Sequence, residues 1–178
     1  MSLADAQAKA TGAFFAAADH KLIDALAPDP DLWVLEVGCR TGATGALALS
    51  SGKCGAWVGL ETDPKSAAEA MFALTDVIGT DPAKAALPYG RAAFGLFIIG
   101  DALADFADPA ASLKALVPLL RPSGRTLASV TRFREREIVR LLKGAGLRIG
   151  AVQAVGGKAG FLGFGRKQPE RIEVVAKR

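Results

Sequence analysis

Apolar and polar positions along the chain follow two alternating patterns. Short apolar runs predict buried strands, and the longer segments between them place apolar residues at helical spacing. The predicted strands cover residues 32–37, 56–61, 75–79, 94–100, 125–131, 147–155 and 170–177. The predicted helices cover residues 43–51, a segment that begins at Pro64, a segment between Pro109 and Pro122, and residues 134–144. Strands that alternate with helices are typical of a parallel sheet under helices on both faces.

Three further segments complete the pattern. An opening helix is expected over residues 4–26, where alanines surround apolar residues at helical spacing and two prolines follow. Residues 81–93 are rich in alanine but contain two prolines, which leaves a turn or two of helix at most. Residues 156–165 contain so many glycines that we expect a loop.

The composition fits one α/β domain over residues 1–178. Of the 178 residues, 51% are hydrophobic and 7% aromatic, so an aliphatic interior can form without disulfides. No signal-peptide pattern and no membrane-spanning apolar run is present, and we therefore expect a cytoplasmic protein. Cys39, Cys54 and the single His20 do not form a metal-binding pattern. The sequence carries no signal for a particular oligomeric state.

The charge is divided unevenly along the chain. Residues 1–120 carry 8 basic and 14 acidic side chains, a net charge of −6, whereas residues 121–178 carry 14 basic and 4 acidic ones, a net charge of +10. The basic part can face an acidic partner, such as nucleic acid, a phosphorylated glycan or lipid headgroups, or it can form a solvated surface. We favour the solvated surface, because no series of aromatic side chains is interleaved with Arg132, Arg134, Arg136 and Arg140.

A glycine-rich turn follows the first predicted strand, in the segment WVLEVGCRTGATG at residues 33–45. Glycine lets a ligand approach the backbone where a Cβ would collide, and the helix that begins near Gly42 directs free N–H groups toward this turn. A dinucleotide fingerprint has its acid about twenty residues after the glycines. Here Glu36 stands before the first glycine, Gly38, so the spacing does not fit a nicotinamide enzyme.

The turn and the segments after it resemble one family. The turn is similar to motif I, E/D-x-G-x-G-x-G, of class I S-adenosylmethionine-dependent methyltransferases, with Arg40 in place of the middle glycine. GLETDP at 59–64 resembles motif II, and AAEA at 67–70 with TDVIGTD at 75–81 resembles the next helix and third strand. FGLFIIGDALADFADP at 94–109 and LLRPSG at 119–124 are similar to segments of the type 11 methyltransferases.

This resemblance covers roughly residues 30–150 and carries expectations about fold and cofactor. It implies a Rossmann-like doubly wound sheet of about seven strands, mostly parallel with an antiparallel last strand. In such a sheet the ligand binds at the carboxyl ends of the strands. The resemblance implies S-adenosyl-L-methionine as the cofactor, held by Glu36, Gly38, Cys39, Arg40, Gly42, Glu61, Thr62, Thr80, Asp81 and Gly100.

Individual positions carry different expectations. Glu61 is expected to accept hydrogen bonds from the two ribose hydroxyls, and its alternative is a solvated acid at a strand end. Glu36 is expected to fix the turn. Asp81 either approaches the adenine or caps the turn before Pro82, since the family acid aligns nearer Thr80.

The expected reaction is methyl transfer to an oxygen or nitrogen of an unidentified acceptor, a small molecule or a glycan. Alignment and exclusion of water supply most of the acceleration for such a transfer. If a base is used, Asp101 and Asp105 are the candidates, whereas His20 is expected at the surface of the opening helix. Nucleic acid stays open as an acceptor, although the chain has no Asn/Asp-Pro-Pro-Tyr run and no Pro-Cys pair.

Several positions depart from the family pattern. Arg40 can bind the cofactor carboxylate, turn to solvent or block the site, and Gly95 stands where an acid is usual. Ala104-Asp105 stand where the type 11 pattern has Glu-His, and the segment after the fifth strand is short. The alternative is therefore a catalytically inactive methyltransferase-like module that binds a partner through its basic face or its glycine-rich loop.

Overall fold

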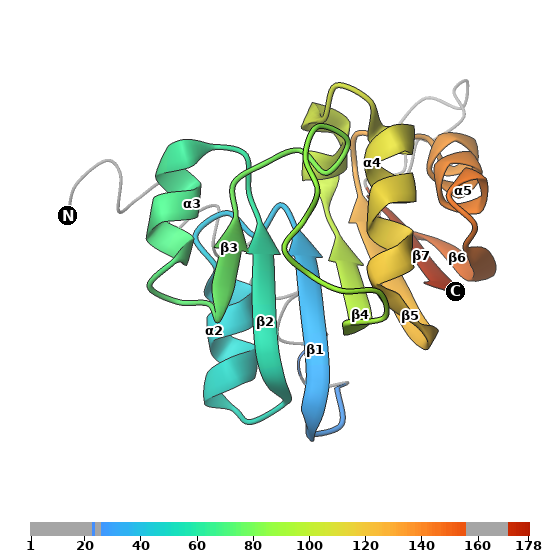
Figure 1. Cartoon of the computed structure of the whole chain (residues 1–178). Helices are drawn as coiled ribbons and strands as arrows, with labels where there is room; N and C mark the ends of the chain where they lie inside the picture. Colours follow the sequence, from blue (N-terminus) through green and yellow to red (C-terminus); the bar gives the residue numbers. More distant parts are fainter. Residues whose placement is uncertain (1–22, 24–25, 156–170) are drawn as a thin grey trace, which may run out of the picture.

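The structure is a seven-stranded sheet with helices on both faces (Figure 1). This computed structural model describes residue 23, residues 26–155 and residues 171–178. The strands are β1 (Asp29–Val37), β2 (Cys54–Leu60), β3 (Asp76–Ile78), β4 (Phe94–Ile99), β5 (Leu120–Val130), β6 (Arg148–Val155) and β7 (Arg171–Lys177). The helices are α2 (Ala43–Ser50), α3 (Pro64–Ala70), α4 (Pro109–Leu116) and α5 (Glu135–Gly144), with 3₁₀ helices η1 (Asp101–Asp105) and η2 (Val117–Leu119).

The strand order is β3-β2-β1-β4-β5-β7-β6. Strands β1 to β5 pair in parallel, whereas β7 is antiparallel to both β5 and β6. The chain starts the sheet in its middle at β1, builds outward to β3, and returns to the other side of β1 with β4. The predicted doubly wound sheet with an antiparallel last strand is confirmed.

Neighbouring residues of the central strands pack into two separate cores. Leu35 and Val37 of β1 join a cluster that includes side chains of α4 and α5, whereas Val34 packs on the other face with Trp57 of β2 and Ala48 of α2. Helices cover both faces of these strands, so their side chains are apolar in both directions, as in other buried parallel strands. Figure 1 shows α4 and α5 in front of the sheet and α2 behind it.

Helices α3 and α4 begin at Pro64 and Pro109, as the sequence predicted, and each follows an aspartate that caps it. Oδ2 of Asp63 accepts the backbone N–H of Ser66 at 2.9 Å, and α3 begins at Pro64. The hydroxyl of Ser66 also donates to Asp63, and this bond, together with the smaller effect of the backbone bond, lowers the pKa of Asp63. Helix α4 begins at Pro109, and Asp108 caps it in the same way. An N-cap carboxylate before a first-turn proline satisfies amides that have no partner within the helix.

The observed boundaries differ from the expected ones where strand pairing extends beyond the apolar runs. Strand β1 begins at Asp29, which pairs with Cys54, and β5 begins at Leu120, which pairs with Phe94. Both extensions lie beyond an irregularity in the register, which the apolar pattern does not contain. Residues 81–93 form turns, and η1 was not expected.

Three expectations lie outside the described residues: the opening helix over residues 4–26, apart from its last part, the position of His20, and the loop at residues 156–165. Within that expected helix, Ile23 is helical and buried against the core that contains Trp57. In the part of the chain that the structure describes, no helix is both long and apolar enough to cross a membrane.

Candidate functional site

The carboxyl ends of the parallel strands bring four predicted segments to one edge of the sheet, at the top of Figure 1. The turn at residues 38–42 follows β1, and Glu61 and Thr62 follow β2. Thr80 and Asp81 come shortly after β3, and Gly100 comes between β4 and η1. Because β1 lies between β2 and β4, the turn occupies the centre of this edge.

Glu61 ties the end of β2 to the turn. Its Oε2 accepts the backbone N–H of Arg40 at 2.9 Å, and its Oε1 accepts that of Asp63 at 3.0 Å. The side chain is buried. A carboxylate has about four acceptor positions, so these two bonds leave capacity for further hydroxyl donors. Glu61 therefore has a structural role, and its chemistry also fits a vicinal diol.

The turn uses left-handed backbone at three of its residues, with φ of 83° at Gly38, 51° at Arg40 and 79° at Gly42. A Cβ at Gly38 would overlap Cβ of Ala102, so glycine is required there by the close approach of η1. For Arg40 the same conformation costs roughly 1–2 kcal/mol, and its side chain is exposed. The bond to Glu61 helps to hold this strained residue in place.

The side chain of Glu36 lies on the face of β1 that α2 covers. Its buried Oε2 accepts the indole N–H of Trp57 at 2.8 Å, next to α2. The bond satisfies a polar group in the core between β1 and β2. The carboxylate is also close enough to Cys39 of the turn for its charge to raise the pKa of that thiol.

Cys39 is buried under the turn against Gly59, where a Cβ would overlap the Cys39 sulfur. Burial, followed by the negative charges of Glu36 and Glu61, raises the pKa of the Cys39 thiol to about 12. Burial also raises the pKa of the Cys54 thiol. Both side chains are therefore neutral thiols at physiological pH and poor nucleophiles.

Asp81 links the segment after β3 to α4. Its Oδ1 accepts the hydroxyl of Ser112 at 2.7 Å and the backbone N–H of Ala83 at 3.0 Å. Burial alone would raise the pKa of Asp81, but these bonds and the charge on Lys84 hold it below its ordinary value. Thr80 is half-buried beside it, and Thr62 is exposed after β2.

The two candidate bases, Asp101 and Asp105, lie on η1 and both contact the segment after β5. Asp101 accepts the backbone N–H and hydroxyl of Thr131, at 2.7 and 2.6 Å, and the backbone N–H of Arg132 at 3.0 Å. Asp105 forms an ion pair with Arg132, and both side chains are about half exposed. Through this contact the pKa of Arg132 is raised. The carboxylates thus anchor the turn between β5 and α5.

Comparisons with known proteins agree on this architecture. No protein-family model matches the chain, and no curated protein matches it. Among solved structures, a TehB-like SAM-dependent methyltransferase from Corynebacterium glutamicum superposes with a TM-score of 0.72, 18% identity, 99% of this chain and 100% of that one. The chain has the class I methyltransferase fold.

Two other solved structures show how widely this methyltransferase fold is used. A chain of the complex between the Haloferax volcanii Trm112 methyltransferase activator and a putative methyltransferase has a TM-score of 0.74 at 14% identity, over 98% of this chain and 94% of that one. The [4+2]-cyclase SpnF has a TM-score of 0.63 at 20% identity, over 76% of this chain and 60% of its own.

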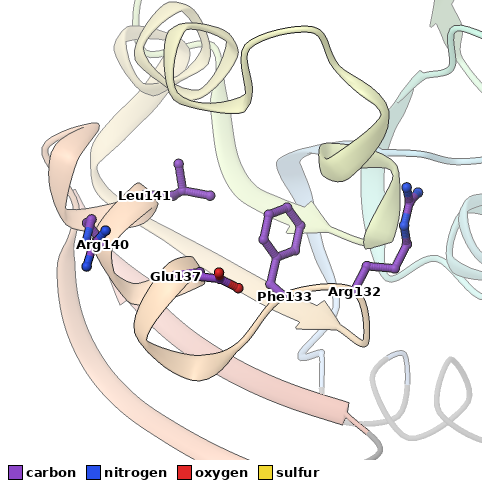
Figure 2. Close-up of a pocket in the computed structure, with 5 residues that line it drawn as sticks. All are labelled: Arg132, Phe133, Glu137, Arg140 and Leu141. Atoms are coloured by element: carbon purple, nitrogen blue, oxygen red, sulfur yellow. The ribbon is translucent and has the colours of Figure 1, made fainter.

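A cavity of about 410 Å³ opens at the turn between β5 and α5, which the two candidate bases contact through Thr131 and Arg132. It is lined by Arg132, Phe133, Glu137, Arg140 and Leu141. Figure 2 shows Phe133, Glu137 and Leu141 between the two arginines, and the Glu137 carboxylate also accepts the backbone N–H of Arg134 at 2.8 Å. Neither Phe133 nor Leu141 was predicted from the sequence. The only available signal was a single aromatic residue between Arg132 and Arg134, and it indicates Phe133 alone.

The described residues present no metal-binding group. Within residues 26–155 and 171–178, no three His, Cys, Asp or Glu side chains come close enough together to hold a metal ion. The chemistry available at the edge of the methyltransferase fold consists instead of carboxylates, backbone amides of the turn and the cationic side chain of Arg40.

Proposed function

We propose that this chain binds S-adenosyl-L-methionine at the carboxyl edge of the sheet and transfers its methyl group to an oxygen or nitrogen of a small-molecule or glycan acceptor. The observation that carries this proposal is the position of Glu61. Its carboxylate lies against the glycine-rich turn, bonded to the Arg40 amide, and keeps acceptor capacity for the ribose hydroxyls.

The remaining predicted residues take the following roles in this proposal. Backbone groups of the turn, at Gly38, Cys39 and Gly42, contact the methionine part of the cofactor, and Glu36 supports the turn from below. Thr62, Thr80, Asp81 and Gly100 border the ribose and adenine. Arg40 stands on the exposed side of the turn, where its guanidinium can either meet the methionine carboxylate or hinder the cofactor.

When bound, S-adenosyl-L-methionine supplies a methyl group on a sulfonium, which is already a strong electrophile. The chain has to hold the acceptor in line with that methyl group and to exclude water. A base takes the proton that the acceptor oxygen or nitrogen loses as its new bond to carbon forms. Oδ1 of Asp105 faces Arg132, which leaves Oδ2 for this proton, and Asp101 is the second candidate.

A specific observation also favours the inactive alternative. In this chain the missing Cβ of Gly38 makes room for Ala102, so that glycine has a packing explanation that needs no ligand. Arg40 adds a strained residue and a cation near the position of a sulfonium. A similar fold also occurs in a [4+2]-cyclase, so the fold alone does not define the reaction.

Titration calorimetry with S-adenosylmethionine and S-adenosylhomocysteine tests both proposals. We expect binding by the unmodified chain, and Glu61→Ala should weaken it by about 1.5–3 kcal/mol for each charge-assisted bond lost. Glu69→Ala, an exposed acid on α3, is the matched control and should leave the affinity unchanged. If millimolar ligand produces no heat of binding and no thermal shift, that result contradicts the enzyme proposal.

Arg40→Gly separates the two proposals by the sign of its effect. We expect a modest gain in cofactor affinity, because glycine removes the left-handed strain and the cation near the sulfonium. A tenfold loss would instead show that the guanidinium holds the cofactor carboxylate.

A further inference from the structure

Strand register aligns three cations across β5, β7 and β6. Arg125 of β5 is directly opposite Lys177 of β7, and Lys177 is directly opposite Arg148 of β6. Directly opposite residues of antiparallel strands point to the same face of a sheet. All three side chains are exposed. We call these residues the basic row.

The basic row lies on the face of the sheet away from α4 and α5. Thr126 and Ala128 of β5 are buried, and Ala128 packs in the core that includes α4 and α5. Leu127 packs on the other face, against the core cluster that includes Trp57 and Ala48. Because side chains alternate along a strand, Arg125 points to the same face as Leu127.

The three cations of the basic row repel one another. Adjacent strands are about 4.8 Å apart, and like charges directly opposite each other destabilise a sheet. Among residues 26–155 and 171–178, none of the three forms an ion pair with a carboxylate. Glu173, on the same face of β7, is paired with Arg171 at 2.7 Å instead. Arg148 donates a hydrogen bond to a backbone oxygen of Arg178 at 3.3 Å.

More positive charge surrounds the same end of the sheet. Arg121, at the start of β5, donates to the backbone oxygen of Asp31 at 3.2 Å, and Arg178 donates to that of Pro118 at 3.3 Å. Both guanidiniums therefore use carbonyl groups, which compensate no charge. The nearby acids Asp29 and Asp31 stand at the start of β1, with β4 between them and β5.

We propose that the basic row binds the phosphate backbone of a nucleic acid. A row of cations about 10 Å long, set by the strand spacing, can face several of the phosphates that follow one another along a polynucleotide. The large exposed apolar side chains of the described residues are Trp33, Met71, Phe72 and Val152. Of these only Val152 belongs to these strands, and it pairs with Val174 on the face of α4 and α5.

The basic row therefore has neither an aromatic side chain for stacking a base nor an apolar one for insertion into a membrane. Contact with phosphates alone predicts binding without sequence preference. Arg125, the member of the row on β5, lies six residues before Thr131, which Asp101 contacts, so the proposal does not depend on the proposed methyl transfer.

Fluorescence anisotropy with a labelled 20-base-pair DNA duplex tests the proposal. For three phosphate contacts the slope of log K against log salt is about −2.7, which is a loss of about 40-fold between 50 and 200 mM salt. We expect the triple variant Arg125→Ser, Arg148→Ser, Lys177→Ser to bind at least tenfold more weakly at 50 mM salt, with a slope shallower by about 2.7.

A matched control exists on α5. The variant Arg134→Ser, Arg136→Ser, Lys143→Ser removes the same charges from exposed positions in the same half of the sequence, and should change the affinity less than twofold. Equal weakening by the control would show that only net charge matters and would overturn the proposal. Absence of duplex binding at 50 mM salt would overturn it too, as would binding of phosphatidylserine vesicles in place of DNA. Thermal melts report whether each variant is folded.

Discussion

The two halves of the strand order differ in how their charged residues are paired. On the side of β3, β2, β1 and β4, the carboxylates of Glu36, Glu61 and Asp81 are buried and accept hydrogen bonds from the chain itself. On the side of β5, β7 and β6, the basic row is exposed and has no carboxylate partner within the described residues. Charge on the first side builds local structure, whereas charge on the second side is left available to a partner.

The largest expected effect comes from the glycine turn. Gly38→Ala should lower the free energy of unfolding by about 3 kcal/mol, because the new Cβ overlaps Ala102 and φ is 83°. Urea denaturation measures this change. The double variant Gly38→Ala, Ala102→Gly should regain the packing part of the loss. No regain would mean that only the backbone conformation matters.

The buried acid of β1 should show the next largest effect. Trp57→Phe removes the indole donor to Glu36, and loss of a hydrogen bond to a charged group costs about 1.5–3 kcal/mol. Trp33→Phe, at a partly exposed position of β1, serves as the control and should cost clearly less. Equal costs in thermal and urea unfolding would show that ring volume, and not the bond to Glu36, stabilises this region.

The lowered pKa of Asp81 predicts that the free energy of unfolding depends on pH. Because its pKa in the folded chain is lowered from 3.8, Asp81 stabilises the fold above that value, and the contribution is lost as the pH falls through the folded pKa. Ser112→Ala should cost about 1.5 kcal/mol near neutral pH, and the difference from the unmodified chain should shrink in acid. Urea denaturation between pH 2 and pH 7 measures it. A cost independent of pH would rule out the bond to the ionised carboxylate.

The smallest effect concerns the basic row. Lys177→Glu places an acid between Arg125 and Arg148, and each opposite-charge pair should add about 0.2–1 kcal/mol to the free energy of unfolding. In 1 M salt, where the screening length is about 3 Å, the gain should disappear. A loss of stability at low salt would mean that the three cations do not face one another as the register indicates.

Much of the fold could be predicted because local pattern reports burial. The run at 94–100 became β4, and the signals at Asp63-Pro64 and Asp108-Pro109 became the starts of α3 and α4. The early starts of β1 and β5 could not be predicted, since they depend on pairing with strands distant in the sequence. The same is true of η1, which packs on Gly38 through Ala102.

The sequence predicted that the candidate residues would come together at one edge of the sheet, but it did not predict their contacts. The order of the strands placed Glu61 and the turn at one edge, because carboxyl ends of parallel strands meet there. The partners of the acids were not foreseen. Glu36 accepts a hydrogen bond from Trp57, and Asp101 accepts hydrogen bonds from Thr131. These contacts could not be predicted, because each residue and its partner lie in different strands or turns.

The sequence by itself determined the type and order of the elements, the glycine turn and the excess of basic residues after position 120. These features are local or additive, so periodicity and counting reveal them. The tertiary structure decided which carboxylates are buried and bonded, and which three of the cations stand side by side. Arg125, Arg148 and Lys177 become neighbours only through the pairing of β7 with both β5 and β6, because register is a property of paired strands and not of any one segment.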